Sequence, residues 1–468
     1  MSRHKRGGGC VAVVAVLAML LPSAIGLARV SDAPATGAVR SIVLFNRAPG
    51  DITERLRAAG ITHAAVFSRV RSAVVVGTEG ARRTIAGWPE VVGVYPDQAL
   101  SLQSYQATKN TGVDRVRTGA PPLHRAYTGK GVTVAVVDSG IDSTHPDLAD
   151  AVALNLSFDL ETILRPVGDT PVSPVETAIG VDELEHGTNI AGVIAGRGRA
   201  AVGHDDMRGV APDSMIVNLR MHPLTEAAVL AAYEWLVAHH NDARFPGGIR
   251  VTANGWGSDR PIPAVRAALG AAIDQGMVVV FPAGNGGGDA EANTVLYPAR
   301  YPEVIAVGAI CKDEDDWSKE LWNSASPTDI PRGRPLCGES RIVTYSSRGP
   351  ELDVVAPGHD IWTVRPITSR IPGFTPRYAQ PPSPGGDDPA TVASNGTWYA
   401  WYDSTSMAHA HVAGIAALML EANPDLTQAD VERILSATAR DIGVSGYDPE
   451  AGHGRVDALA AVAAAEAS

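Results

Sequence analysis

Two kinds of hydrophobic pattern alternate along most of the chain. The first is a short, nearly unbroken apolar run, such as 132–137, which is typical of a strand buried on both faces of a parallel sheet. The second is a longer stretch of helix-forming residues, such as 225–239. Strands that alternate with helices predict an α/β domain with a mostly parallel sheet, in which reactive side chains gather at the carboxyl ends of the strands. Further strands are predicted at 215–219, 251–253, 277–281, 304–307 and 352–355, and further helices at 190–195, 263–275 and after 454.

A smaller pattern precedes this domain, between residues 40 and 97. Four apolar runs and two amphipathic segments follow one another in the order βαββαβ, which is that of ferredoxin-like α+β units. Residues 98–111 are mostly polar and lack periodicity, so we expect a linker there. Within the larger domain, 311–337 and 366–395 are interpreted as surface insertions.

The first 28 residues have the composition of a cleaved signal peptide. A basic start leads into the apolar run 11–21, and small residues follow near Ala28. The run is too short for a membrane span, and no second long apolar run follows. We therefore expect a secreted, extracellular protein without membrane contact once this peptide is removed.

Length, charge and cysteine content limit the number of domains, the possible partners and the possible disulfides. The chain has 468 residues, which suggests two or three domains, and a formal net charge of -12, which argues against nucleic acid as a partner. Cys311 and Cys337 lie beyond the signal peptide, and two cysteines in an exported chain suggest one disulfide. Two free buried thiols are the alternative.

Three polar residues occupy positions where such a sheet would place its chemistry. Asp138 ends the first buried strand, His186 opens a helix of small residues, and Ser406 precedes a long helix-forming run. Each also has a plain structural interpretation, as a turn cap, a polar surface residue and a helix N-cap respectively. The chain order Asp, His, Ser is one of the orders found in triad proteases.

The segments around these residues resemble the motifs of the subtilisin-like serine proteases (subtilases, peptidase family S8). The three motifs read AVVDSGID, HGTNIAG and STSMAHAHVAG, and weaker matches are VVVFPAGN, YPARYPEVIAVGA and SSRGPELDVVAPG. VVGVYPD, which closes the small unit, is similar to the end of an inhibitor I9-type prosegment. With the signal peptide predicted from composition over 1–28, the resemblance implies a ferredoxin-like α+β prosegment over 29–103 and a three-layer α/β subtilisin-like peptidase domain over 104–468.

The resemblance also implies an activity and roles for individual residues. The protein would be a monomeric serine endopeptidase that hydrolyses peptide bonds and is made as a self-processing zymogen inhibited by its own prosegment. Ser406 would be the nucleophile, His186 the general base, and Asp138 the carboxylate that orients the imidazole. Asn285 would stabilise the oxyanion together with the backbone N–H of Ser406.

Contacts with a bound peptide are predicted on two segments. Asn254, Trp256 and Gly257 resemble the strand that pairs with the substrate, and Ala283 and Gly284 resemble the opposite wall of the first specificity pocket. Leu296 is expected near the pocket floor, which favours small or medium apolar side chains at the cleaved position.

Several residues depart from the family pattern. Ser404 stands for a usual glycine and is expected to crowd Ser406 through its Cβ, while Asn189 stands for a histidine and Gly255 for a serine. His409 replaces a small or hydroxyl residue and Ala410 a proline. The chemistry needs no cofactor. Asp147 resembles a calcium ligand, but the calcium loop of the family is not recognisable over 196–209, so a structural Ca²⁺ ion is an open expectation.

Two other functions fit less well. A catalytically silent subtilase fold used for binding would be expected to lack a triad residue, and the chain has all three. An ester-cleaving α/β hydrolase would carry its serine in a Gly-x-Ser-x-Gly turn with the histidine last, and Ser406 has no such turn around it.

Overall fold

A computed structural model describes residues 38–47, 50–97, 101–102, 111–167, 174–199, 207–288, 293–311, 342–359, 361–366 and 399–468, all within one compact unit. The predicted signal peptide and most of the two predicted insertions lie outside these residues. We refer to residues 38–97 as the N-terminal unit and to the residues from 111 onward as the main domain.

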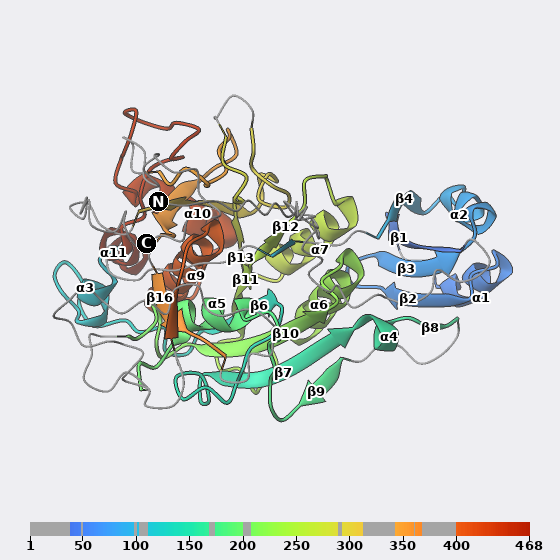
Figure 1. The fold of residues 1–468 in the computed structure, drawn as a ribbon, viewed down its shortest axis with the longest axis horizontal. Helices are drawn as coiled ribbons and strands as arrows, with labels where there is room; N and C mark the ends of the chain where they lie inside the picture. Colours follow the sequence, from blue (N-terminus) through green and yellow to red (C-terminus); the bar gives the residue numbers. More distant parts are fainter. Residues whose placement is uncertain are drawn as a thin grey trace, which may run out of the picture. The chain divides into compact units, whose positions relative to one another are not determined.

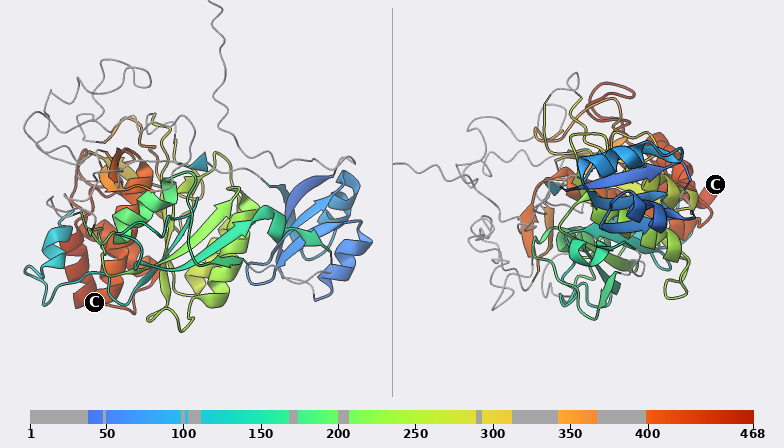
Figure 2. Two further views of the ribbon diagram at one scale, coloured as in Figure 1. Left: turned by 60° about the horizontal axis from the view of Figure 1, so that its bottom comes forward. Right: turned by 90° about the vertical axis from the view of Figure 1, so that its right-hand side faces the viewer.

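The N-terminal unit has the predicted βαββαβ order (blue in Figures 1 and 2). Its strands pair antiparallel in the order β4-β1-β3-β2, as the ferredoxin-like prediction requires. One face of the sheet packs against Leu56 and Ile85 from the two helices. The elements are β1 (Val39–Phe45), α1 (Ile52–Ala58), β2 (His63–Phe67), β3 (Ser72–Gly77), α2 (Glu79–Ala86) and β4 (Val91–Pro96).

The main domain contains the predicted α/β sheet. Eight strands follow the order β15-β14-β13-β11-β6-β10-β7-β9, and all neighbours are parallel except β7 and β9. The strands are β6 (Thr133–Asp138), β7 (Val152–Asp159), β9 (Val175–Thr177), β10 (Met215–His222), β11 (Ile249–Asn254), β13 (Val278–Pro282), β14 (Ile305–Ile310) and β15 (Val354–Pro357).

Helices cover both faces of this sheet, which confirms the three-layer prediction. A hydrophobic core lies on each face of the sheet. Along β6, Val134 and Val136 point into one core, and Ala135 and Val137 point into the other. The first core contains α5 (His186–Ala195), α9 (Thr405–Ala422), α10 (Gln428–Thr438) and α11 (Ala458–Ala467), and the second contains α6 (Glu226–His239) and α7 (Pro263–Asp274). Figure 1 shows α5 and α9 beside the centre of the sheet.

Short elements complete the described part of the chain. A two-stranded hairpin of β16 (Ile361–Val364) and β17 (Tyr399–Tyr402) leads directly into α9. A further short strand, β8 (Arg165–Pro166), pairs with β2 and so adds a fifth strand to the sheet of the N-terminal unit. The others are α3 (Val113–Arg117), α4 (Leu160–Ile163), β5 (Ser101–Leu102) and β12 (Trp256–Gly257).

The order of the strands places a site at one end of β6. The chain adds β7 and β10 on one side of β6 and β11, β13, β14 and β15 on the other. Ligands of open α/β sheets bind outside the carboxyl ends of the strands where the order reverses in this way. Asp138 is the last residue of β6 and lies at that point.

Candidate active site

Asp138 and His186 form a buried pair. His186 Nδ1 lies 2.7 Å from Asp138 Oδ1, which also accepts a hydrogen bond of 2.7 Å from the backbone N–H of Ser139. Both side chains are almost fully buried. The carboxylate therefore sets which ring nitrogen of His186 carries the proton, and leaves Nε2 as the proton acceptor.

A second carboxylate, Asp182, connects the end of β6 to the start of α5. It accepts hydrogen bonds from the Ser139 hydroxyl at 2.8 Å and from the backbone N–H and the hydroxyl of Thr188 at 2.9 and 2.7 Å. Ser139 in turn accepts from the N–H of Gly187. Burial raises the pKa of Asp182 to about 6. Sequence reasoning missed this residue, although an aspartate four positions before a helix-opening histidine is a recognisable signal.

Glu185, directly before His186, holds the start of α5 in an unusual way. Its φ of 65° lies in the left-handed region, which non-glycine residues seldom adopt. Its buried carboxylate accepts hydrogen bonds from the Arg365 guanidinium at 3.2 and 3.3 Å and from the Tyr402 hydroxyl at 3.2 Å. Both partners belong to the hairpin segment that precedes Ser406, so this contact joins the histidine helix to the serine helix.

Ser406 is the second residue of α9, at the position that the sequence predicts for the nucleophile. Its Oγ and the Nε2 of His186 are both buried, and neither has a hydrogen-bond partner among the described residues. A Cβ atom at Gly255 would meet Asp138 Oδ2 and would lie 2.6 Å from His186 Cε1. Glycine in place of the usual serine therefore leaves this space to the aspartate and the histidine.

The predicted oxyanion donors surround the start of α9. Asn285 Oδ1 accepts hydrogen bonds from the backbone N–H of Thr405 at 2.9 Å and from its hydroxyl at 2.8 Å. Because a backbone N–H can only donate, the oxygen of the amide faces Thr405 and its NH₂ group lies on the other side. The N–H of Ser406, the second predicted donor, is bonded to Ser404 Oγ at 2.8 Å.

Two further histidines lie inside α9. His409 and His411 are fully buried, and neither ring nitrogen of His409 has a hydrogen-bond partner among the described residues. Burial lowers the pKa of His409 to about 3 and that of His411 to about 4, so both rings are neutral at pH 7. Asn189, which replaces a family histidine, is also buried.

The predicted substrate residues divide into two groups. The side chains of Asn254 and Trp256 belong to the core: Asn254 accepts from Tyr233 at 2.8 Å, and Trp256 Nε1 donates to the carbonyl of Val137 at 3.0 Å. Only backbone contacts are then open to a peptide at these two positions.

The pocket residues lie together. A Cβ at Gly257 would be 3.0 Å from Leu296, and one at Gly284 would be 2.7 Å from it. The N–H of Leu296 donates to the carbonyl of buried Ala283 at 2.8 Å. Leu296 thus lies against both segments that are predicted to form the walls of the pocket, and its role as the pocket floor stays a prediction.

The structure gives Asp147 partners that do not suit a calcium site. Its carboxylate accepts hydrogen bonds of 2.6 Å from both the backbone N–H of Arg199 and the hydroxyl of Tyr399. Nearby, the guanidinium of Arg197 donates to four backbone carbonyls, those of Ala195, Asp150, Pro212 and Ser214. Within the described ranges, no group of three or more His, Cys, Asp and Glu residues could hold a metal ion. The described residues around Asp147 therefore do not include the set of carboxylates that would mark a calcium site.

The remaining predictions concern the cysteines and the membrane. Cys311 is disulfide-bonded, and its predicted partner Cys337 lies outside the described residues. No helix in the described ranges combines the length and hydropathy that a membrane crossing needs.

Comparisons with known proteins identify the family of the chain. A family model described as "Subtilase family" matches residues 129–454. Subtilisin E of Bacillus subtilis (strain 168) is 30% identical over 386 residues, which cover 81% of this chain and 78% of that protein. Subtilisin of Bacillus pumilus is 32% identical over 341 residues, which cover 72% of this chain and 93% of that protein.

A solved structure shows the same fold. The crystal structure of fervidolysin from Fervidobacterium pennivorans, described as a keratinolytic enzyme related to subtilisin, superposes with a TM-score of 0.62 at 22% identity. The match covers 91% of this chain and 61% of that one. With the family model spanning most of the main domain, these findings show that the chain belongs to the subtilase (peptidase S8) family of serine endopeptidases.

Proposed function

We propose that the chain is a secreted serine endopeptidase, made as a zymogen that cuts itself between the N-terminal unit and the main domain. One observation carries the proposal. Strand β5 pairs antiparallel with β12, so that Leu102 lies opposite Trp256 and Ser101 opposite Gly257. The linker of the chain itself is therefore paired with the strand that is predicted to bind substrate. Addition of an extended peptide to the edge of a strand is a common mode of peptide recognition.

The register of this pairing supports a specific cleavage site. The next residue of the main-domain segment in this register is Gly255, where an added Cβ would lie 2.6 Å from His186 Cε1. We therefore propose the bond between residues 103 and 104 as the site of self-cleavage, at the boundary expected from the sequence. Residues 29–103 would then be the prosegment and 104–468 the peptidase.

The proposed mechanism uses the groups described above. Ser406 Oγ attacks the scissile carbonyl while His186 Nε2 takes its proton, and Asp138 stabilises the imidazolium through Nδ1. The NH₂ group of Asn285 and the N–H of Ser406 stabilise the oxyanion. His186 then returns the proton to the leaving amine, and water hydrolyses the acyl-enzyme in the same way. No step needs a cofactor.

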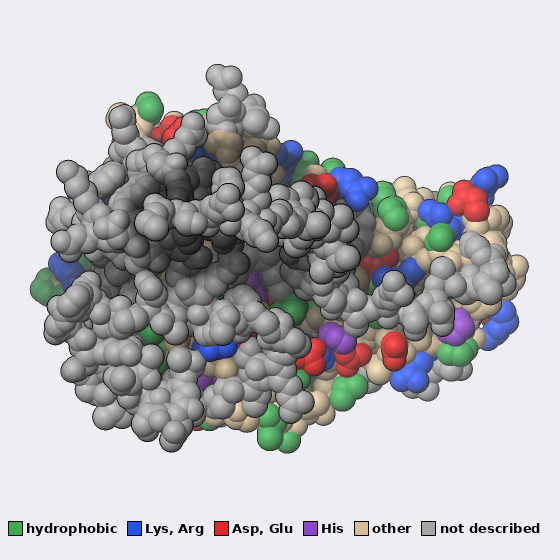
Figure 3. Space-filling view, in the orientation of Figure 1, with side chains coloured by type: hydrophobic (Ala, Val, Ile, Leu, Met, Phe, Trp, Pro, Cys, Tyr) green, Lys and Arg blue, Asp and Glu red, His purple; other side chains and the backbone are tan. Residues whose placement is uncertain are grey.

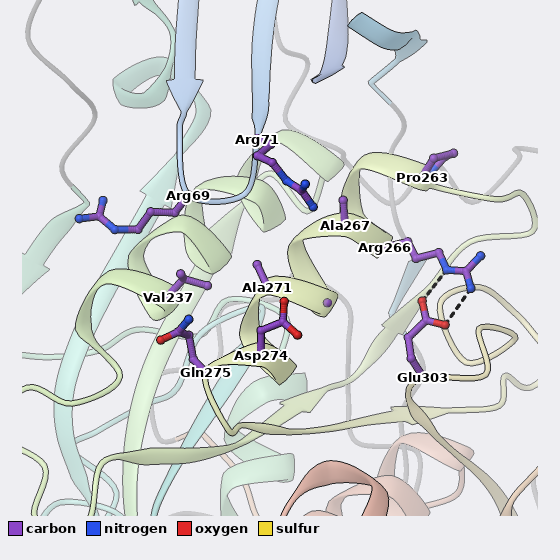
Figure 4. Close-up of a pocket in the computed structure, with 11 residues that line it drawn as sticks. Arg69, Arg71, Val237, Pro263, Arg266, Ala267, Ala271, Asp274, Gln275 and Glu303 are labelled. Atoms are coloured by element: carbon purple, nitrogen blue, oxygen red, sulfur yellow. Dashed lines mark hydrogen bonds and ion pairs between the residues drawn. The ribbon is translucent and has the colours of Figure 1, made fainter. Parts of the chain in front are cut away.

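The N-terminal unit contacts the main domain in ways that suit an inhibitor. Glu234 of α6 accepts hydrogen bonds from the backbone N–H groups of Arg69 and Val70 at 2.9 and 3.1 Å. The N–H of Ala227, in the first turn of α6, donates to Asp97 at 3.1 Å. A pocket of about 800 Å³ lies beside this contact. Arg69 and Arg71 line it from one side and residues of α7 from the other (Figure 4), and none of its lining residues belongs to the triad.

Secretion and specificity complete the proposal. The signal-like composition of residues 1–28 supports export, and Leu296 between Gly257 and Gly284 supports a preference for small or medium apolar side chains in substrates other than the chain's own linker, whose Gln103 precedes the bond proposed for self-cleavage. A panel of chromogenic peptides tests the second point, and a preference for Lys or Arg at the cleaved position would contradict it.

Expression of the full chain beside Ser406→Ala tests the function. We expect the unchanged chain to cut itself at 103–104, as intact mass would show, and to react with a fluorophosphonate probe. The variant keeps the fold but lacks the nucleophile, so neither event should occur. Equal trimming of both chains would point to another protease, and absence of labelling in both would favour the silent binding protein.

A further inference from the structure

Ser404 occupies a position that affects the chemistry of Ser406 directly. It is the N-cap of α9, and its Oγ accepts a hydrogen bond of 2.8 Å from the N–H of Ser406. Its side chain is fully buried. Its φ and ψ of -177° and 167° describe an extended backbone that any residue adopts. Glycine is therefore not required here for conformational reasons, and the Ser404 side chain places both a Cβ and a hydroxyl beside Ser406.

The N–H of Ser406 cannot serve two acceptors equally well. A hydrogen bond needs an acceptor near the axis of the N–H bond, and the Ser404 hydroxyl lies there in this structure. The oxyanion that forms during attack needs the same donor at about 2.7–3.1 Å. We propose that the Ser404 hydroxyl competes with the substrate oxyanion for the N–H of Ser406, and that Ser404 thereby limits the rate of acylation. This inference rests on the endopeptidase function proposed above.

The surrounding hydrogen bonds show why this competition matters. Thr405 directs both its N–H and its hydroxyl to Asn285 Oδ1, so neither of them points at a substrate. The Asn285 NH₂ group and the N–H of Ser406 are the donors predicted for the oxyanion. The N–H of Ser406 is already bonded to the Ser404 hydroxyl. For substrate to gain it, the Ser404 side chain must rotate and give up the cap of α9. Helix stability and turnover are thus opposed at this residue.

Three substitutions at this position separate the hydroxyl from the Cβ. Ser404→Gly removes both, Ser404→Ala keeps the Cβ, and Ser404→Thr keeps the hydroxyl and the cap. We expect kcat to rise about fivefold in the Gly and Ala variants, the factor that corresponds to one N-cap hydrogen bond, with KM within about twofold of the unchanged enzyme. The Thr variant should keep the original kcat.

The measurement uses the self-processed enzyme from the full chain, with active sites counted by fluorophosphonate titration, so that misfolded molecules do not enter kcat. Inhibition by a peptide aldehyde, which forms an oxyanion on Ser406, should tighten by the same factor in the Gly and Ala variants. Thr427→Ala is the control, because Thr427 is also a side-chain N-cap, with its hydroxyl accepting from the N–H of Asp430 in α10 and not from a residue of α9. It should lower the melting temperature without changing kcat.

Three outcomes would overturn the inference. A rise in Ser404→Gly alone would assign the effect to crowding by the Cβ. An unchanged or lower kcat in both Gly and Ala variants would show that the hydroxyl does not compete. If kcat also rises in Thr427→Ala, the increase comes from a general loosening of the fold and not from the Ser404 hydroxyl. If no chain, including the unchanged one, is labelled or cleaves peptide, the proposed function itself fails, and this inference with it.

Discussion

At the scale of single residues, the site depends on side chains that no motif contains. Glu185 adopts a left-handed backbone conformation, which typically costs about 1–2 kcal/mol for a residue with a Cβ. Its buried hydrogen bonds with Arg365 and Tyr402 offset that cost. Because these partners lie just before α9, the same contacts set the distance between the segments that carry His186 and Ser406.

Substitution of Glu185 tests this role. Glu185→Gln keeps the shape of the side chain but removes the charge that Arg365 faces, so we expect the free energy of unfolding to fall by about 2 kcal/mol. Urea unfolding of the Ser406→Ala chain with and without the second substitution measures the loss without self-digestion. Combination with Arg365→Gln should cost less than the sum of the single effects, and full additivity would contradict the pairing.

The buried histidines predict a loss of stability in acid. Burial holds the pKa of His409 and His411 near 3 and 4, below the value of about 6.5 in an unfolded chain. The unfolded chain therefore binds more protons below pH 6.5, and stability that is fully present above that pH falls as the pH decreases.

His409→Ser removes one of these groups. Both chains carry Ser406→Ala. Between about pH 6.5 and pH 5, we expect the free energy of unfolding to fall by about 2 kcal/mol less in the chain with His409→Ser than in the chain that keeps His409. Urea titrations at the two pH values give the difference. Identical losses in both chains would show that His409 is protonated as readily in the folded protein as in the unfolded one.

At the scale of elements, the main domain holds the N-terminal unit at more than one place. The face of its sheet that carries Ile42 and Val74 packs into the core that contains α6 and α7, and β5, in the linker that follows the unit, pairs with β12. The third contact is β8, which extends the sheet beyond β2, with Val167 donating from its N–H to the carbonyl of Thr62 at 3.0 Å. An added strand of this kind stabilises the association without touching the catalytic groups.

Val167→Pro should weaken the association of β8 with the N-terminal unit. Proline removes the N–H that bonds to Thr62, and one backbone hydrogen bond corresponds to about a fivefold change in an equilibrium. After self-cleavage of the full chain, we expect peptidase activity to appear faster in the variant, while kcat of the fully active enzyme stays unchanged. An unaltered time course would mean that β8 does not contribute to retention of the N-terminal unit.

At the scale of the whole molecule, charge is arranged for local pairing. On the face drawn in Figure 3, basic and acidic side chains lie interspersed over the described part of the N-terminal unit. Near Asp147 the positive charge comes from Arg197, which follows α5. Its guanidinium donates hydrogen bonds to the carbonyls of Asp150, Pro212 and Ser214. A fixed guanidinium can link carbonyl groups as a bound ion would.

Removal of calcium should therefore leave the protein intact. We expect the Ser406→Ala chain to melt at the same temperature in EDTA and in excess calcium. Arg197→Gln should lower the melting temperature by roughly 2–4 °C for each kcal/mol lost. A large fall in EDTA with the unchanged arginine would show that a calcium ion does bind.

Much of the fold could be predicted because its signals are local. Unbroken apolar runs predicted β6, β11 and β13, and the βαββαβ order of the N-terminal unit was confirmed. The strand predicted at 352–355 is shifted in the structure to Val354–Pro357, since an apolar run does not mark its own ends. Strand β8 and the hairpin of β16 and β17 were not predicted, because such short segments are held by partners that are distant in the sequence.

What the sequence by itself determined is the kind of chemistry and the scaffold: an aspartate, a histidine and a serine in motifs, on an alternation of strands and helices. Only the tertiary structure decided how these groups are held, through Asp182, the Glu185–Arg365 pair and the hydroxyl of Ser404. The reason is physical. Hydrophobic periodicity and helix caps act over a few residues and can be read along the chain, whereas hydrogen bonds in a site join residues up to 217 positions apart and form only when the fold brings them together.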